Sequence, residues 1–137
     1  LLSTGARWGE VAALEQRRVL HCRITFSKTK NSKNRTVPIS ESLFEKIKKR
    51  GGKLVFPTLD YSLVRDVIKT VAPDVPDGQA VHALRHTFAS HFMMNGGNIL
   101  TLQKILGHAK IQTTMIYAHL APDYLQDAVR FNPLGGA

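Results

Sequence analysis

Apolar residues recur at helical spacing in one stretch of the second half of the chain: Val81, Leu84, Phe88 and Phe92. A repeat of three to four residues is typical of an amphipathic helix, and glycine commonly follows a helix end. Gly96 and Gly97 come shortly after this stretch. The pattern therefore predicts one helix that begins near Val81 and ends before Gly96.

Between residues 19 and 39 the repeat changes to two residues. Ile24 and Phe26 alternate with polar side chains, and Val37 continues the alternation after a polar connection. Strict alternation is typical of strands with one buried face. Pro38 is expected to end the last strand, because proline cannot donate to a strand ladder. This region predicts a small three-stranded antiparallel sheet.

Capping signals predict helices on both sides of this sheet. Thr4 is predicted to cap a short helix that turns Val11 and Leu14 inward. Ser42 and Glu45 form a capping-box pattern at the start of a second helix. Both helices are expected to turn an apolar face inward.

Five further elements are predicted along the rest of the chain. A brief strand is expected at residues 53–56. The next helix is expected to bury an apolar side made of Leu63, Val64, Val67, Ile68 and Val71. Asn98 is predicted to cap a helix that ends at Gly107, and two final helices are expected, one through Tyr117 and one opened by Pro122. The predicted fold class is α+β, mainly α-helical, with the small antiparallel sheet packed against the helices.

The composition limits the class of protein. The chain has 137 residues, 43% of them hydrophobic, which fits one globular domain. Lysine and arginine number 19 against 10 aspartates and glutamates, a formal net charge of +9. This surplus favours a polyanionic partner, and nucleic acid is preferred to a membrane surface because no basic amphipathic helix with a broad apolar face is found. No apolar run approaches the ~20 residues that span a bilayer.

The start of the chain and its cysteine content indicate the context in which the protein functions. The sequence opens at Leu1 without an initiator methionine, so we expect it to begin inside a longer protein. Cys22 is the single cysteine and cannot form an internal disulfide. Such cysteine usage is typical of a reducing, intracellular compartment.

Two pairs of residues have the spacing of helix neighbours. His82 and Arg85 are three residues apart on the central helix, and Arg7 and Glu10 are three apart near the chain start. An imidazole and a guanidinium on one rigid helix face suit the binding of a small anion. The alternative is an ordinary salt-bridged surface, since short motifs are frequent by chance.

If these groups meet in space, they suit phosphoryl transfer. Arg7 and Arg85 can each fork onto oxygens of one phosphate and stabilise a pentacoordinate transition state without a metal. Tyr117 then attacks phosphorus, and because a phenol titrates near ~10, His82 is expected to take its proton. His108 is expected to hydrogen-bond a phosphoryl oxygen. The product is a covalent phosphotyrosine that stores the bond energy for a later hydroxyl.

The connection at residues 28–35 combines turn-forming residues with four cations. Such a loop suits contact with a phosphate backbone, and the alternative is a solvated hairpin tip. Lys28, Lys33 and Arg35 are the predicted DNA-binding residues. Lys30 or Lys33 is the expected general acid that protonates the departing sugar oxygen.

Several segments, in this order, resemble the boxes of the tyrosine recombinases, the phage integrase family. They are Thr4-Gly5-Ala6-Arg7-Trp8-Gly9-Glu10, Lys30 ahead of Arg35-Thr36-Val37-Pro38, His82-Ala83-Leu84-Arg85-His86-Thr87-Phe88-Ala89, Leu106-Gly107-His108 and Tyr117. One such box is a weak signal, whereas all of them in order are a strong one. Trp8 departs from the commoner pattern, which places a smaller residue after the first arginine.

The resemblance implies a role for each matching residue. The catalytic set would be Arg7, Lys30, His82, Arg85, His108 and the nucleophile Tyr117. Glu10 matches the acidic residue that supports the first arginine. The resemblance gives Lys30 the place of the general acid, by its distance from the end of the hairpin. His86 is expected to support this set or to pack within its helix, and no metal or cofactor is expected.

The resemblance also implies a setting for the domain. Residues 1–137 would form a single catalytic domain with the DNA breaking-rejoining fold. It would be the C-terminal part of a longer recombinase, without the core-binding and arm-binding domains. It would integrate and excise phage DNA at double-stranded attachment sites through a 3′-phosphotyrosine. The full-length protein would act as a homotetramer in the host-cell cytoplasm, at the nucleoid, with DNA-bending accessory proteins as further partners.

Three other functions fit parts of the sequence. A non-catalytic DNA-binding module would keep the fold and the charge. A type IB topoisomerase shares the tyrosine chemistry. A metal-dependent hydrolase could use His82 and His86, which lie four residues apart as in zinc-binding helices, although the intervening glutamate and a third ligand are lacking.

Overall fold

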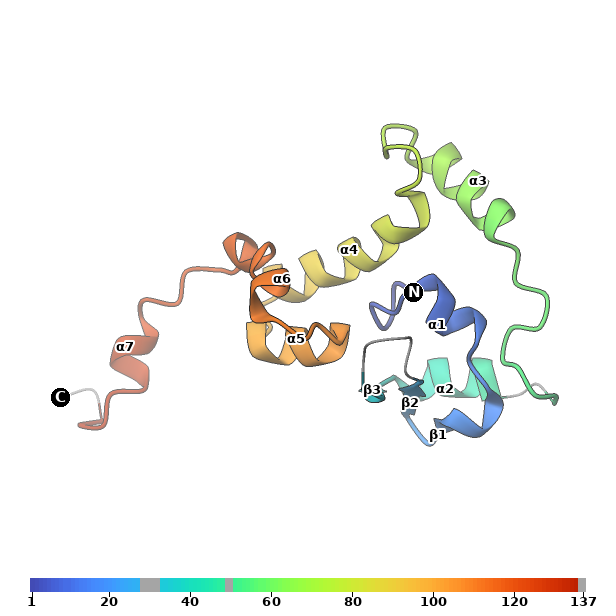
Figure 1. Ribbon diagram of the computed structural model, residues 1–137. Coiled ribbons are helices and arrows are strands. Elements are labelled where there is room, and N and C mark those ends of the chain that lie inside the picture. Colours follow the sequence, from blue (N-terminus) through green and yellow to red (C-terminus); the bar gives the residue numbers. More distant parts are fainter. Residues whose placement is uncertain (28–32, 49–50, 136–137) are drawn as a thin grey trace.

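The computed structural model describes residues 1–27, 33–48 and 51–135 and is mainly helical with one small sheet (Figure 1). The helices of this part of the chain are α1 (Trp8–Ala12), α2 (Glu41–Lys48), α3 (Tyr61–Val71), α4 (Ala80–Met94), α5 (Ile99–Leu106), α6 (Ile111–Met115) and α7 (Asp127–Arg130). The 3₁₀ turns are Gln16–Arg18 and Ala118–Leu120, and the strands are β1 (Val19–Leu20), β2 (Arg23–Phe26) and β3 (Arg35–Pro38). The predicted fold class is confirmed.

Helix α4 links the two ends of the molecule. Figure 1 shows α3 at its N-terminal end, α5 and α6 at its C-terminal end, and the sheet with α2 on the far side of α1. Helix α7 extends away from the rest. The predicted helix is confirmed, and α3 and α5 pack against it.

The three strands form an antiparallel sheet in the order β1-β2-β3. Ile24 pairs with Val37 and Thr25 pairs with Thr36, so alternate pairs face opposite sides. Ile24 and Val37 are buried in the core, whereas the two threonine hydroxyls hydrogen-bond each other at 2.9 Å on the other face. The predicted alternation is confirmed, and Pro38 is the last residue of β3.

Two predicted helix caps are wrong. Helix α1 begins at Trp8, and the hydroxyl of Thr4 instead accepts a hydrogen bond from the N–H of Ala6 in a buried turn. In α2 the capping hydroxyl belongs to Ser40, which accepts from a first-turn N–H at 3.2 Å, and not to Ser42. A cap must stand just before the first helical turn, and both segments contain more than one residue able to fill that place.

Two further elements differ from the prediction. Residues 53–56 form no strand, and a single bridge joins Leu54 to Glu15. Helix α7 begins at Asp127 rather than at Pro122. An apolar run of three residues, Leu54 to Phe56, has the composition of a strand, but it becomes one only where a partner strand has free ladder groups.

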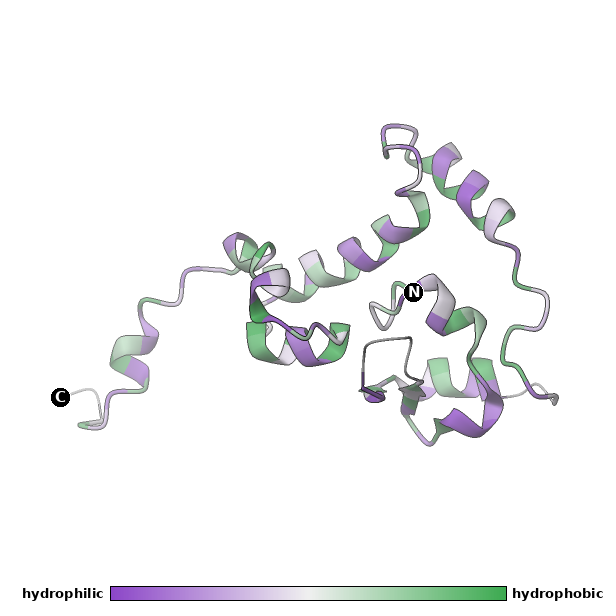
Figure 2. Ribbon diagram, viewed as in Figure 1, coloured by the Kyte–Doolittle hydropathy of each residue, from purple (hydrophilic) through white to green (hydrophobic). Residues whose placement is uncertain are grey.

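The apolar side of α3 is buried only in part. Ile68 is buried and Val64 is partly buried, because they pack against the start of α4. Leu63, Val67 and Val71 are 64%, 56% and 78% exposed, so the predicted inward stripe is wrong for these three residues. Figure 2 shows hydrophobic and hydrophilic residues mixed along this helix. In the described part of the chain, no helix has the length and apolarity needed to cross a membrane.

Helix α5 has the predicted limits. The Asn98 side chain accepts hydrogen bonds from two first-turn N–H groups at 2.9 and 3.1 Å, and Gly107 ends the helix in the left-handed region. Leu102 and Leu106 are fully buried in a cluster that includes Ala89 of α4. The end of α5 is thereby fixed against the middle of α4.

Gly107 lies where a larger residue does not fit. Its φ is +71°, and a Cβ placed on it would lie 2.9 Å from Cδ of Arg35. Arg35 reaches this point from β3, and its Nε donates to the carbonyl of Ile105 at 2.7 Å. The strand and the helix end can approach this closely only because residue 107 is glycine.

We expect Gly107→Ala to lower the free energy of unfolding by roughly 1–3 kcal/mol, because the left-handed conformation is costly for alanine and the methyl group meets the Arg35 stem. Urea denaturation followed by circular dichroism measures this. Gly9→Ala in α1 is the matched control, since a Cβ there meets nothing within 4 Å, and it should be neutral or slightly stabilising. Equal effects at the two positions would contradict this packing role.

Candidate active site

Arg85 is a buried cation that joins three segments of the chain. It lies on α4 and is 3% exposed. Its Nη1 donates to the carbonyl of Gly5 at 2.5 Å, and its Nη2 donates to the carbonyl of Leu106 at 2.8 Å. One side chain therefore ties the N-terminal turn and the end of α5 to α4. Arg85 is not part of an ordinary salt-bridged helix surface.

Gly5 makes this arrangement possible. It is buried with a φ of +64°, and a Cβ placed on it would lie 2.6 Å from the Phe88 ring and 2.8 Å from a methyl group of Leu106. Without a side chain, the N-terminal turn can lie directly against α4 and α5. That close approach brings the Gly5 carbonyl to Arg85.

The environment of Arg85 leaves it charged and partly free to bind. Burial and the nearby cations Arg7 and Arg35 lower the pKa of Arg85 to about 10, while Glu10 and Tyr117 act in the opposite direction. The group is therefore still protonated at neutral pH. A guanidinium has five N–H donors, and the contacts among the described residues use three of them. Two donors are left for a ligand.

His108 follows α5 and contacts Arg85 directly. Arginine can only donate, so the 3.1 Å contact from Arg85 Nη2 makes His108 Nε2 the acceptor. The neutral ring then carries its hydrogen on Nδ1, which donates to the Thr114 hydroxyl at 2.7 Å. Burial, and then the charges of Arg85, Arg7 and Arg35, lower the pKa of His108 to about 4. Both ring nitrogens are thus used within the protein, so the expected bond to a phosphoryl oxygen requires one of these contacts to open.

Tyr117 lies just after α6 with its side chain held in the core. It is 6% exposed and packs with Ala89 and Leu102. Its hydroxyl hydrogen-bonds Nδ1 of His86 on α4. Burial raises the pKa of Tyr117, and the charge of Arg85 offsets only part of this rise. The phenol is neutral at neutral pH and needs a base before it can act as a nucleophile.

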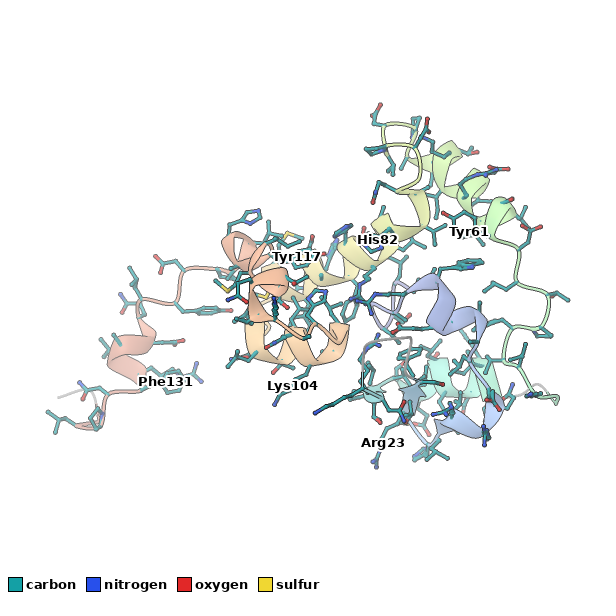
Figure 3. The ribbon with its side chains drawn as sticks, viewed as in Figure 1. Arg23, Tyr61, His82, Lys104, Tyr117 and Phe131 are labelled. Atoms are coloured by element: carbon teal, nitrogen blue, oxygen red, sulfur yellow. The ribbon has the colours of Figure 1, made fainter. Side chains whose placement is uncertain are left out.

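His82 lies one helical turn before His86, and the two rings pack edge to face with centroids 4.6 Å apart. His82 lines a pocket of about 180 Å³ together with Arg7 and Arg85. Burial, and then the charges of His86, Arg85 and Arg7, lower the pKa of His82. Figure 3 shows the side chain of His82 on α4 and that of Tyr117 just after α6. His82 lies in one pocket with both arginines. It was also expected to take the proton of Tyr117, but the Tyr117 hydroxyl contacts His86 instead.

Glu10 holds the first arginine in place. Its side chain has no exposed surface, and its Oε2 accepts a hydrogen bond from the Arg7 N–H at 2.8 Å. Its Oε1 lies 3.5 Å from Nη1 of Arg7, whose side chain is 40% exposed. The predicted ion pair is therefore present, with the carboxylate inside and the Arg7 guanidinium toward the pocket.

Arg35 is a correction to the sequence-based prediction. It was expected to contact DNA, but Nη1 and Nη2 both bond the carboxylate of Glu10 and Nε bonds the carbonyl of Ile105. The guanidinium also lies 4.9 Å from the centre of the Phe26 ring, and the side chain is 9% exposed. All of its nitrogens are used within the protein because a buried carboxylate requires a bidentate partner.

Of the other hairpin cations, Lys33 lies within the described residues. Lys33 is exposed, as its predicted role requires. Lys28 and Lys30 lie outside the described residues, so their roles stay predictions. Among the residues that the structure describes, no group of three or more His, Cys, Asp or Glu side chains is arranged to hold a metal ion.

Two contributors to the site were missed from sequence. Thr114 is fully buried and orients His108 through its hydroxyl, and Gly5 supplies a carbonyl to Arg85. Thr114 carries no local signal, because a buried hydroxyl is defined by its partner and not by its neighbours in sequence. Gly5 stands between Thr4 and Ala6, where glycine indicates a turn but not which side chain the turn contacts.

Comparison with known proteins places these residues in a family context. The model of the phage integrase family matches residues 1–123. The integrase of Escherichia phage P2 is 57% identical over 135 residues, which cover 98% of this chain and 40% of that integrase. The solved catalytic domain of bacteriophage HP1 integrase has a TM-score of 0.87 at 52% identity, covering 99% of this chain and 80% of that one.

A more distant structure shares the fold alone. The XerH site-specific recombinase, solved bound to palindromic difH substrate as a post-cleavage complex, has a TM-score of 0.66 at 23% identity. The match covers 93% of this chain and 42% of that chain. The chain spans about 40% of the length of the curated integrases that it matches.

We expect Glu10→Gln to lower the free energy of unfolding at pH 7 by about 2–4 kcal/mol, because it leaves buried arginine charge without its partner. Burial raises the pKa of Glu10, but hydrogen bonds from Arg35 and Arg7 and their charges leave it below its ordinary value. A carboxylate with a lowered pKa stabilises the folded chain above its unfolded pKa of about 4.3, and this contribution is lost as pH falls. The deficit should therefore shrink in urea denaturation below about pH 4. Glu45→Gln, on the exposed side of α2, is the control, and a deficit that is equal at both pH values would argue against the charge pair.

Proposed function

The chain belongs to the phage integrase family, and we propose that it is the catalytic domain of a site-specific recombinase that cuts and rejoins DNA through a covalent 3′-phosphotyrosine. The observation that carries the proposal is one cluster of side chains. Arg7, His82 and Arg85 line a single pocket, and the hydroxyl of Tyr117 bonds a histidine one turn along the same helix.

The two arginines are proposed to bind the reacting phosphate. Arg7 is partly exposed beside the pocket, and Arg85 has donors left after its backbone contacts. Together they place two positive charges where a phosphate would gain negative charge in its transition state. His108 fixes Arg85 by accepting from it, so its proposed role is to orient that guanidinium and, once its Nδ1–H is released from Thr114, to donate to a phosphoryl oxygen.

The nucleophile is proposed to be Tyr117. Its oxygen bonds to phosphorus as the bond from phosphorus to the 5′ oxygen breaks, which leaves the phosphate on the tyrosine. We assign the phenolic proton to Nδ1 of His86, because that nitrogen is its hydrogen-bond partner. His82 is then left to face the phosphate. Lys30 is proposed to give a proton to the departing 5′ oxygen, on the family resemblance alone.

The partner is proposed to be double-stranded DNA containing an attachment site. The formal charge of +9 supports a phosphate backbone as the ligand, and Lys33 is an exposed cation on the hairpin. The XerH structure is of a site-specific recombinase bound to its palindromic difH substrate. We further propose that the whole protein has core-binding and arm-binding domains, works as a homotetramer with DNA-bending proteins, and acts on phage DNA at the nucleoid in the host cytoplasm.

We expect Tyr117→Phe to abolish a covalent adduct with DNA while leaving DNA affinity within a few-fold, because only one oxygen is removed. A nicked suicide substrate that traps the adduct, resolved on a denaturing gel, measures this. The wild-type reaction should proceed in a strong chelator, since the arginines provide the positive charge. Tyr124→Phe on the exposed C-terminal segment is the control. An adduct that survives Tyr117→Phe, or needs an added metal, would refute the proposal.

We expect His86→Asn to slow adduct formation by about 10²- to 10⁴-fold, because asparagine can bond the phenol but cannot take its proton. Single-turnover rates on the suicide substrate, measured across pH, test this with DNA affinity as the check on folding. His82→Asn is the matched comparison one turn away. A larger loss for His82→Asn, with His86→Asn near wild type, would return the base to His82.

A further inference from the structure

The pocket that holds the two arginines also has an aromatic wall. Trp8 and Tyr61 line it together with the cationic residues, and Ala6, Gly78 and Val81 complete the lining. The two rings pack edge to face, with centroids 5.1 Å apart and planes at 88°. Figure 3 shows Tyr61 at the start of α3 and His82 on α4. Residues of α1, α3 and α4 therefore combine cationic and aromatic side chains in one pocket of about 180 Å³.

The aromatic wall is supported by packing and by a helix cap. Trp8 packs at its inner side against the cluster that contains Ile68 and Val81. Tyr61 is held at the start of α3, where the Asp60 side chain accepts two first-turn N–H groups at 2.8 and 3.2 Å. A ring that is already immobilised loses little freedom when a ligand stacks on it.

Part of this wall is open to solvent. Tyr61 is 38% exposed, and Trp8 is only partly buried. Trp8 and Arg7 line the same pocket, so a phosphate bound there by Arg7 lies near the indole. The next group along a nucleic acid strand is a sugar with its base, and aromatic side chains stack on any base because every base has a π-face.

We propose that Trp8 and Tyr61 bind the unpaired nucleobase adjoining the phosphate held by Arg7 and Arg85. This rests on the proposed function, because that function supplies the phosphate. A base inside a duplex is covered on both faces by its neighbours, so the aromatic wall can act only on a nucleotide released from pairing. Nucleotides beside a cut become unpaired when strands separate, and the site would then hold the cut end in place.

The single tryptophan of the chain makes the site directly observable. Trp8 emission is followed while the chain is titrated with a short single-stranded oligonucleotide that ends in a 3′ phosphate. The same oligonucleotide with an abasic last residue, and inorganic phosphate, are the comparison ligands. We expect the intact oligonucleotide to quench Trp8 and to bind about 5- to 100-fold tighter than the abasic one, the range of base-aromatic stacking. The abasic ligand and phosphate should leave the emission unchanged.

Two variants of Tyr61 distinguish stacking on a base from packing between helices, and both keep Trp8 as the fluorescent reporter. Tyr61→Leu should reduce the affinity for the intact oligonucleotide toward that of the abasic one, whereas Tyr61→Phe should keep it. Tyr124→Leu, an exposed tyrosine on the C-terminal segment, should change nothing. Equal quenching by intact and abasic ligands, or an unchanged affinity in Tyr61→Leu, would overturn the proposal and leave the pair as packing between α1 and α3.

The proposal can fail separately from the proposed function. If the suicide substrate gives a Tyr117-dependent adduct but Trp8 does not respond to the base, the base site is wrong and the recombinase function stands. If no adduct forms although the base quenches Trp8, the function is wrong and the base site stands.

Discussion

The buried carboxylate of Glu10 is the interaction on which the rest of the site depends. A carboxylate with no exposed surface is costly to desolvate, and it is stable here because Arg35 forks onto it and the Arg7 backbone donates to it. Arg35 comes from β3 and also bonds the carbonyl of Ile105 at the end of α5. The contacts that pair the Glu10 carboxylate therefore join α1, the sheet and α5. They also fix the position of Arg7.

The charge balance of this region suits the binding of an anion. Three arginines, at positions 7, 35 and 85, lie near one another with Glu10 as their acidic partner, and their mutual effect contributes to the lowered pKa of Arg85. Arg85 is stabilised in a second way, by carbonyls of Gly5 and of Leu106, the last residue of α5. Carbonyls at a helix end carry partial negative charge. These contacts hold a cation inside the protein but do not neutralise it, so a surplus of positive charge faces the pocket.

The proposed nucleophile, Tyr117, lies in an apolar environment beside this charge. Tyr117 is packed in the hydrophobic cluster of α4 and α5, and burial keeps its phenol neutral. The bond to His86 fixes the oxygen on the same helix that carries Arg85. Helix α4 thus carries the proposed base and two of the proposed phosphate-binding residues on one rigid backbone, against which the proposed nucleophile is held.

The sequence by itself determined the features that depend on near neighbours along the chain. Helical spacing gave the limits of α4, an asparagine and a glycine gave those of α5, and a period of two gave the sheet. The tertiary structure decided which partner each polar group found. Arg35 looked like a DNA-binding residue because its hairpin is basic, yet its partner Glu10 lies 25 residues earlier. His86 and not His82 meets Tyr117, a choice set by how the chain after α6 folds back on α4. Hydrogen-bond and ion-pair partners that are distant in sequence produce no periodic pattern along the chain. They are determined by tertiary packing, because a buried charge or donor must be paired.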